Sequence, residues 1–242
     1  GRTGRHFIRR YDEERSLRAL IFLDQSASMR SRYPGSCQYS KFDAGQAFAF
    51  YLSRVFFYNQ ERVGLALGPG NLGAFLPPAS GGEAMERITR LLEKKIAADA
   101  GKETNYEALV GALMERLEEK TELYFISDFY AEPAVLMKAF APLKKARISL
   151  YLVHIVDSNE LGVSPPEDWK DRRLEFQDSE SRMKELLEDP DFRRRYRGLV
   201  EAHIAELGKI ARRSGMAYLP FMTGEPFFSQ FLKRFSEQRN GS

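Results

Sequence analysis

The sequence contains a single cysteine, Cys37, among its 242 residues. One cysteine excludes an internal disulfide framework and any zinc site built from several thiolates, and it predicts a reducing compartment, with the cytoplasm as the default location. No run of about eighteen apolar residues occurs, so no membrane-spanning helix is expected. The basic first ten residues are not followed by the apolar core of a signal peptide. The sequence begins with Gly1 rather than methionine, so we expect it to belong to a longer protein, and any anchor would lie outside it.

The formal net charge is only +3, which is too small to indicate nucleic-acid binding by the chain as a whole. One predicted helix is locally basic, but Glu201 and Glu206 interrupt its cations, and only one aromatic residue, Tyr196, stands among them. A solvated helix face is therefore favoured over a phosphate-binding surface. The cations of this helix are Arg193, Arg194, Arg195, Arg197, Lys209, Arg212 and Arg213.

Short apolar runs alternate with amphipathic segments along most of the chain, whose hydrophobic content is 43%. This alternation predicts a doubly wound α/β fold, in which a mostly parallel sheet has helices on both faces. A short strand ended by Pro77 and Pro78 is the expected antiparallel edge strand. Strands are predicted at about 19–24, 62–67, 74–76, 123–127, 148–156 and 217–222, and helices at about 39–58, 82–97, 105–120, 133–146, 191–214 and 226–238.

We predict one domain spanning residues 1–242, with residues 1–18 as a lead-in from an upstream region. Residues 158–189 are rich in prolines and charges and contain Trp169, and they are too long for an ordinary connection. Residues 174–176 are predicted to pair as a short strand. This insertion and the surface formed by residues 26–32 are the expected contact regions for a partner.

The segment Asp24-Gln25-Ser26-Ala27-Ser28-Met29 follows directly on an apolar run, residues 19–23. Because such a run indicates a buried strand, Asp24 is placed at its carboxyl end, where open α/β sheets bind ligands. Carboxylate and hydroxyl oxygens suit Mg²⁺ or Mn²⁺. The alternative is that Asp24 and the serines only cap the next helix.

Common enzyme signatures do not account for the sequence. The run Gly68-Pro69-Gly70-Asn71-Leu72-Gly73 matches the dinucleotide pattern G-x-G-x-x-G, but an extended segment rather than a helix is predicted to follow it. Residues 101–104 lack the spacing of a phosphate-binding loop, and neither a G-x-S-x-G nor an H-E-x-x-H pattern occurs. A phosphatase that forms an aspartyl-phosphate would need an acid where Ser26 stands.

The sequence resembles the von Willebrand factor A (VWA) domain, whose metal-ion-dependent adhesion site (MIDAS) follows the pattern Asp-x-Ser-x-Ser, then a threonine, then an aspartate. The matching residues are Asp24, Ser26, Ser28, Thr104 and Asp128. Each is predicted at the carboxyl end of a strand or in an adjacent loop. The resemblance implies that these five residues bind Mg²⁺ or Mn²⁺.

A closer resemblance is to the bacterial "domain of unknown function 58" family, whose members are commonly encoded beside MoxR-type AAA+ ATPases. The residues that carry it are Phe7-Ile8-Arg9-Arg10-Tyr11-Asp12-Glu13-Glu14-Arg15, the segment from Asp24 to Met29, Arg62-Val63-Gly64-Leu65 and Ser127-Asp128-Phe129. The sequence departs from the family in lacking the usual upstream region and in having Glu103 where glycine often precedes the threonine.

These resemblances imply a non-enzymatic protein-interaction module, in which an Asp or Glu of a partner protein completes the metal coordination. A MoxR-type AAA+ ATPase is the implied partner, and no nucleic acid is expected. Two other functions stay open at this stage: a Mg²⁺-dependent hydrolase acting on phosphate, and a nucleic-acid-binding module that uses the basic helix at 193–213. A vestigial site that binds no metal is a further alternative.

Overall fold

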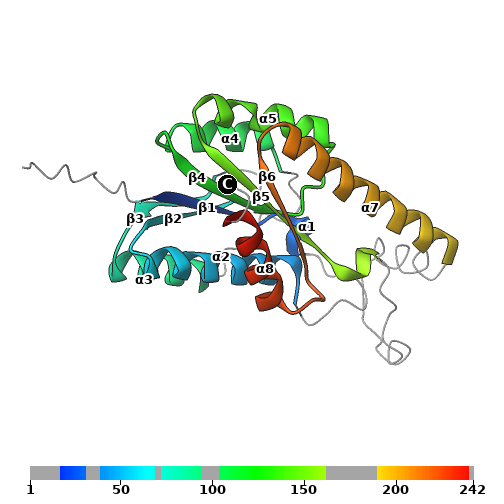
Figure 1. Cartoon of the computed structure of the whole chain (residues 1–242), viewed down its shortest axis with the longest axis horizontal. Helices are drawn as coiled ribbons and strands as arrows, with labels where there is room; N and C mark the ends of the chain where they lie inside the picture. The colour runs from blue at the N-terminus through cyan, green and yellow to red at the C-terminus, as the bar shows by residue number, and fades with distance from the viewer. Residues whose placement is uncertain (1–16, 31–38, 69–71, 94–103, 162–189, 240–242) are drawn as a thin grey trace, which may run out of the picture.

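Six strands form one sheet in the order β3-β2-β1-β4-β5-β6 (Figure 1). The computed structural model describes residues 17–30, 39–68, 72–93, 104–161 and 190–239. All neighbouring strands are parallel except β2 and β3, which are antiparallel. The strands are β1 (Arg18–Asp24), β2 (Arg62–Gly68), β3 (Ala74–Ala79), β4 (Thr121–Ser127), β5 (Ser149–Val156) and β6 (Ala217–Met222).

Helices cover both faces of the sheet. Figure 1 shows α2, α3 and α8 on one face and α4, α5 and α7 on the other. The described helices are α1 (Ala27–Arg30), α2 (Lys41–Tyr58), α3 (Gly82–Glu93), α4 (Tyr106–Met114), α5 (Pro133–Lys145), the 3-10 helix η1 (Ser158–Leu161), α7 (Pro190–Arg213) and α8 (Phe227–Arg239). The predicted doubly wound, mostly parallel α/β fold is thereby confirmed.

Strand β1 shows why the apolar runs lie at the centre of this sheet. Ile21 and Leu23 belong to the hydrophobic core on the side of α2 and α3, whereas Leu20 and Phe22 belong to the core on the side of α4 and α5. A strand with a core on each face must be apolar at every position. Asp24 ends this run and is itself fully buried.

The edge strand β3 is longer than predicted, because it continues through Pro77 and Pro78 to Ala79. Prolines are tolerated here, since an edge strand has one side without ladder hydrogen bonds. Gly64 on β2 permits the close approach of this strand: a Cβ atom at Gly64 would lie 2.5 Å from the carbonyl oxygen of Leu76. The expectation that the two prolines end the strand was wrong.

The helix predicted at 105–120 is also shorter in the structure, where α4 ends at Met114. The residues after Met114 include Glu115, Glu118 and Glu119. Acidic side chains are unfavourable at the negative end of the helix dipole, and they offer little apolar surface to bury. The helical spacing was therefore extended too far.

The other predicted elements agree with the structure to within three residues wherever it describes them, and the short helices α1 and η1 were not predicted. Trp169 and the strand predicted at 174–176 lie outside the described residues, and so do residues 1–16 and 94–103. The single domain over residues 1–242 stays a prediction. Among the described residues, no helix is both long and apolar enough to cross a membrane.

Candidate metal centre at the carboxyl edge of the sheet

Two carboxylates occupy neighbouring positions at the carboxyl edge of the sheet. Asp24 is the last residue of β1, and Asp128 directly follows β4. Because β1 and β4 pair in parallel, their carboxyl ends meet at the same edge. The two side chains are close enough for the charge of Asp128 to raise the pKa of Asp24. Both residues are buried, with exposed fractions of 0% and 2%.

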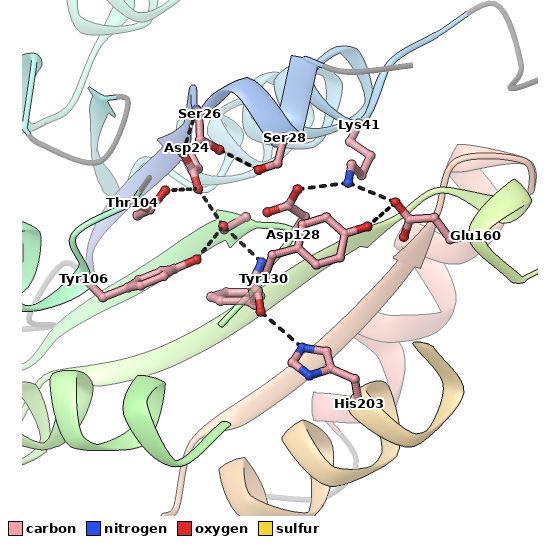
Figure 2. A network of polar contacts seen from close by, with 12 residues as sticks. Asp24, Ser26, Ser28, Lys41, Thr104, Tyr106, Asp128, Tyr130, Glu160 and His203 are labelled. Carbon is pink, nitrogen blue, oxygen red and sulfur yellow. Dashed lines mark hydrogen bonds and ion pairs between the residues drawn. The ribbon is translucent and has the colours of Figure 1, made fainter. Parts of the chain in front are cut away.

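The carboxylate of Asp24 accepts hydrogen bonds at both of its oxygens (Figure 2). Its Oδ1 accepts from the backbone N–H of Ser26 at 2.8 Å, and its Oδ2 accepts from the hydroxyl of Ser127 at 2.7 Å. The Thr104 hydroxyl is 3.4 Å from the same Oδ2. Burial nevertheless raises the pKa of Asp24 from 3.8 to about 6, with the hydrogen bonds opposing the rise and Asp128 adding to it. The ionised form of Asp24 is therefore disfavoured mainly because the carboxylate is removed from water.

The predicted hydroxyl donors surround this carboxylate. The Oγ atoms of Ser26 and Ser28 are 3.1 Å apart, on the segment that leads from β1 into α1. Thr104 directly precedes Asn105, whose side chain caps α4 by accepting from the N–H of Ala108 at 3.0 Å. Thus a sharp strand end and a capped helix start bring residues 80 positions apart into contact.

The motif implies that Asp128 binds a metal ion, whereas in the structure Asp128 forms an ion pair with a lysine. Its Oδ2 lies 2.9 Å from Nζ of Lys41, which also lies 3.0 Å from Oε1 of Glu160. Figure 2 shows the Lys41 ammonium between the two carboxylates, with the ring of Tyr130 beside it. Lys41 is fully buried. The structure therefore brings Asp24, Ser26, Ser28 and Thr104 together, and it adds an internal cation next to Asp128.

Several residues of this network were not predicted from the sequence, although two of them have a recognisable sequence feature. Lys41 stands at the start of a predicted helix, where a cation opposes the helix dipole and so needs acidic neighbours. Ser127 is a hydroxyl at the end of an apolar run beside Asp128. Nothing in the sequence pairs either with its partner. The missed residues are Lys41, Tyr106, Ser127, Tyr130 and Glu160.

Two histidines support the backbone that carries Asp128. His203 on α7 is hydrogen-bonded through Nε2 to the carbonyl oxygen of Phe129 at 3.1 Å. His154 on β5 lies 2.6 Å from the hydroxyl of Tyr218 through Nδ1. Burial, together with the charges of His203 and Lys41, lowers the pKa of His154 to about 3. Both histidines therefore hold neighbouring groups in place through hydrogen bonds.

The donor set fits a hard divalent cation. Two carboxylates and three hydroxyls are oxygen ligands of the kind that Mg²⁺ and Mn²⁺ prefer. Within the described part of the chain, no three His, Cys, Asp or Glu side chains gather into a metal-binding group. Any ion at this edge would thus depend on the hydroxyls of Ser26, Ser28 and Thr104 as well as on Asp24 and Asp128.

Two of the arginines of the basic helix α7 form ion pairs with acidic residues of the same helix. Arg194 pairs with Asp191 at 3.3 Å, and Arg197 pairs with Glu201 at 2.7 Å. All four side chains are at least half exposed, so these are solvent-facing pairs at helical spacing. They are consistent with a solvated helix face.

Comparison with solved structures shows the same fold in two proteins of low sequence identity, and a third structure matches with a lower score. An aerotolerance-related membrane protein from Bacteroides fragilis NCTC 9343, carrying multiple mutations to serine, matches with a TM-score of 0.58 and 14% identity, over 93% of this chain and 100% of that one. The conserved hypothetical protein BatB from Bacteroides thetaiotaomicron matches with a TM-score of 0.51 and 14% identity, over the same shares. The SpRpn10 VWA domain has a TM-score of 0.48 and 9% identity, over 90% and 95%.

The fold and the site define a doubly wound α/β domain with oxygen donors at the carboxyl edge of its sheet. The family model described as "Protein of unknown function DUF58" matches residues 1–206. The chain belongs to this family, as the sequence motifs indicated. No curated protein matches the chain.

Proposed function

We propose that this chain is a non-enzymatic protein-interaction module with a MIDAS-type metal site. Asp24, Ser26, Ser28, Thr104 and Asp128 would bind Mg²⁺ or Mn²⁺, and a carboxylate of a partner protein would complete the coordination. The observation that carries the proposal is the position of the Asp24 carboxylate, which is fully buried next to Asp128 and to the hydroxyl groups of Ser127 and Thr104.

The chemistry of the donors explains why such a site would recognise an acidic residue. Three of the five donors are neutral, so the two carboxylates can at most balance the charge of a divalent ion, which is left able to accept a further oxygen ligand. Binding a further carboxylate in a desolvated interface is then favourable, and removing it is costly. The VWA-like fold supports this kind of role, and a MoxR-type AAA+ ATPase is the partner class that the family resemblance implies.

The first test is isothermal titration of Mg²⁺ and Mn²⁺ into chelator-treated protein. We expect saturable binding to the wild type and none to the Asp24→Ala/Asp128→Ala double variant, because the latter lacks both carboxylates. Glu83→Ala/Glu93→Ala is the matched control, since it also removes two negative charges but from exposed positions on α3. Equal binding to all three proteins would contradict the proposed site.

The second test asks for the partner. Immobilised wild-type protein should retain a purified MoxR-type AAA+ ATPase in Mg²⁺ and release it in a chelator. The Asp24→Ala/Asp128→Ala variant should retain none under either condition. Retention that is unaffected by chelation would place the contact elsewhere on the molecule.

A further inference from the structure

Lys41 is a buried lysine at the N-terminal end of a helix. It is the first residue of α2, and the side chain of Ser40 caps this helix by accepting from the N–H of Asp43 at 3.1 Å. Its side chain is fully buried, although lysines are seldom buried unless they are paired. A cation at this end of a helix also opposes the helix dipole. The position therefore requires strong compensation from neighbouring groups.

That compensation comes from two carboxylates and a ring. Nζ of Lys41 is 2.9 Å from Asp128 and 3.0 Å from Glu160, and it lies 4.2 Å from the ring centroid of Tyr130. Burial by itself lowers the pKa of Lys41, but the charges of Asp128 and Glu160 outweigh it and raise the pKa. The hydroxyl of Tyr130 donates to Glu160, which holds that carboxylate in place (Figure 2). Lys41 is thus a fixed positive charge inside the site.

We propose that Lys41 tunes the metal site by sharing the charge of Asp128, so that the ion binds weakly by itself and more tightly together with an external carboxylate. This inference rests on the proposed function. An ion held at this edge would face the full charge of Asp24 but only part of the charge of Asp128. It would keep excess positive charge, which a carboxylate from a partner satisfies. Lys41 is therefore a residue that sets ligand preference and does not itself bind the ion.

Two substitutions, tested singly and together, separate this effect from overall charge. Glu160→Gln leaves Lys41 to Asp128 alone, so Asp128 is neutralised more fully and the ion should bind more weakly. Lys41→Met frees the whole charge of Asp128 and should tighten binding about tenfold or more, because electrostatic interactions between buried groups are strong. Methionine is unbranched and flexible, so it can occupy the space of the lysine stem.

The double variant Lys41→Met/Glu160→Gln is the decisive protein. It removes one positive and one negative charge, so its net charge equals that of the wild type. It also avoids leaving Glu160 buried without its cation, a change that is strongly destabilising in buried ion pairs. If the contact between Lys41 and Asp128 matters, the double variant should bind the ion more tightly than the wild type. Net charge alone predicts equal affinity.

The measurement is Mn²⁺ binding to the full chain, followed by the electron paramagnetic resonance signal of free Mn²⁺. The expected order of affinity is Glu160→Gln, then wild type, then the double variant, then Lys41→Met as the tightest. Circular dichroism establishes which variants are folded, and the order of the other three tests the idea even if Lys41→Met does not fold. Replacing sodium chloride by sodium acetate at equal ionic strength should improve Mn²⁺ binding more in the wild type than in the double variant.

Two results would overturn the inference, and they differ. Mn²⁺ affinities of the wild type and the double variant that agree within about twofold would remove the role of Lys41, whatever the affinity of Glu160→Gln, while the proposed metal site would stand. A lack of Mn²⁺ binding in every folded variant, with or without acetate, would remove the proposed function and this inference with it.

Discussion

Asp24→Asn should stabilise the metal-free protein while abolishing metal binding. The pKa of Asp24 is raised from 3.8 to about 6, chiefly by burial. The folded state therefore disfavours the ionised carboxylate, by about 3 kcal/mol at pH 8, since one pKa unit corresponds to about 1.4 kcal/mol. Asparagine removes this charge but keeps an oxygen that can accept from the N–H of Ser26. Its amide can donate to the oxygens of Ser127 and Thr104.

Because the pKa of Asp24 is raised, the stabilisation by Asp24→Asn should depend on pH. An acid with a raised pKa has no ionisation penalty below pH 3.8, where both states are protonated, and the full penalty above pH 6. Asp24→Asn should thus raise the unfolding free energy at pH 8 by up to about 3 kcal/mol, or the melting temperature by about 6 to 12 °C. Below pH 4, the stabilities of the two proteins should converge.

Urea unfolding in the presence of a chelator, at pH 8 and at pH 4, measures this difference. Glu93→Gln is the control, because it neutralises an exposed carboxylate on α3 and should change stability little. Added Mg²⁺ at one hundred times its dissociation constant should stabilise the wild type by about 2.7 kcal/mol and leave Asp24→Asn unchanged. A variant no more stable than the wild type at pH 8, or a gain that is the same at both pH values, would refute the reasoning.

Two further predictions concern the support of the site and the sheet edge. Folding lowers the pKa of His154 from 6.5 to about 3. As the pH falls from 8 to 5, His154 therefore becomes protonated in the unfolded state only, and this should lower the unfolding free energy by about 2 kcal/mol. Urea unfolding of His154→Phe should show a shallower pH dependence than the wild type, and parallel curves would contradict this. Gly64→Ala would place a Cβ 2.5 Å from the carbonyl oxygen of Leu76 and should cost about 1 to 3 kcal/mol. Thermal unfolding checks it, with Gly111→Ala, where a Cβ has open space, as the control.

Local patterns in the sequence were sufficient for most of the fold. The apolar run of β1 is continuous because the strand is covered on both faces, and such a run is visible without any structure. The edge strand β3 was less visible, because its prolines obscure the pattern. The end of α4 was misjudged, because Leu117 continues the helical spacing of Leu109 and Leu113, whereas the acidic residues after Met114 disfavour a further turn.

The sequence by itself determined the fold class, the family and five candidate donors, because short motifs at strand ends carry that information. Only the tertiary structure decided how their charges are balanced. Lys41 and Glu160 are 119 positions apart, and they meet around Asp128 because parallel strand ends and the start of α2 converge at one edge of the sheet. A buried ion pair depends on desolvation and on distances of about 3 Å, which no local pattern encodes.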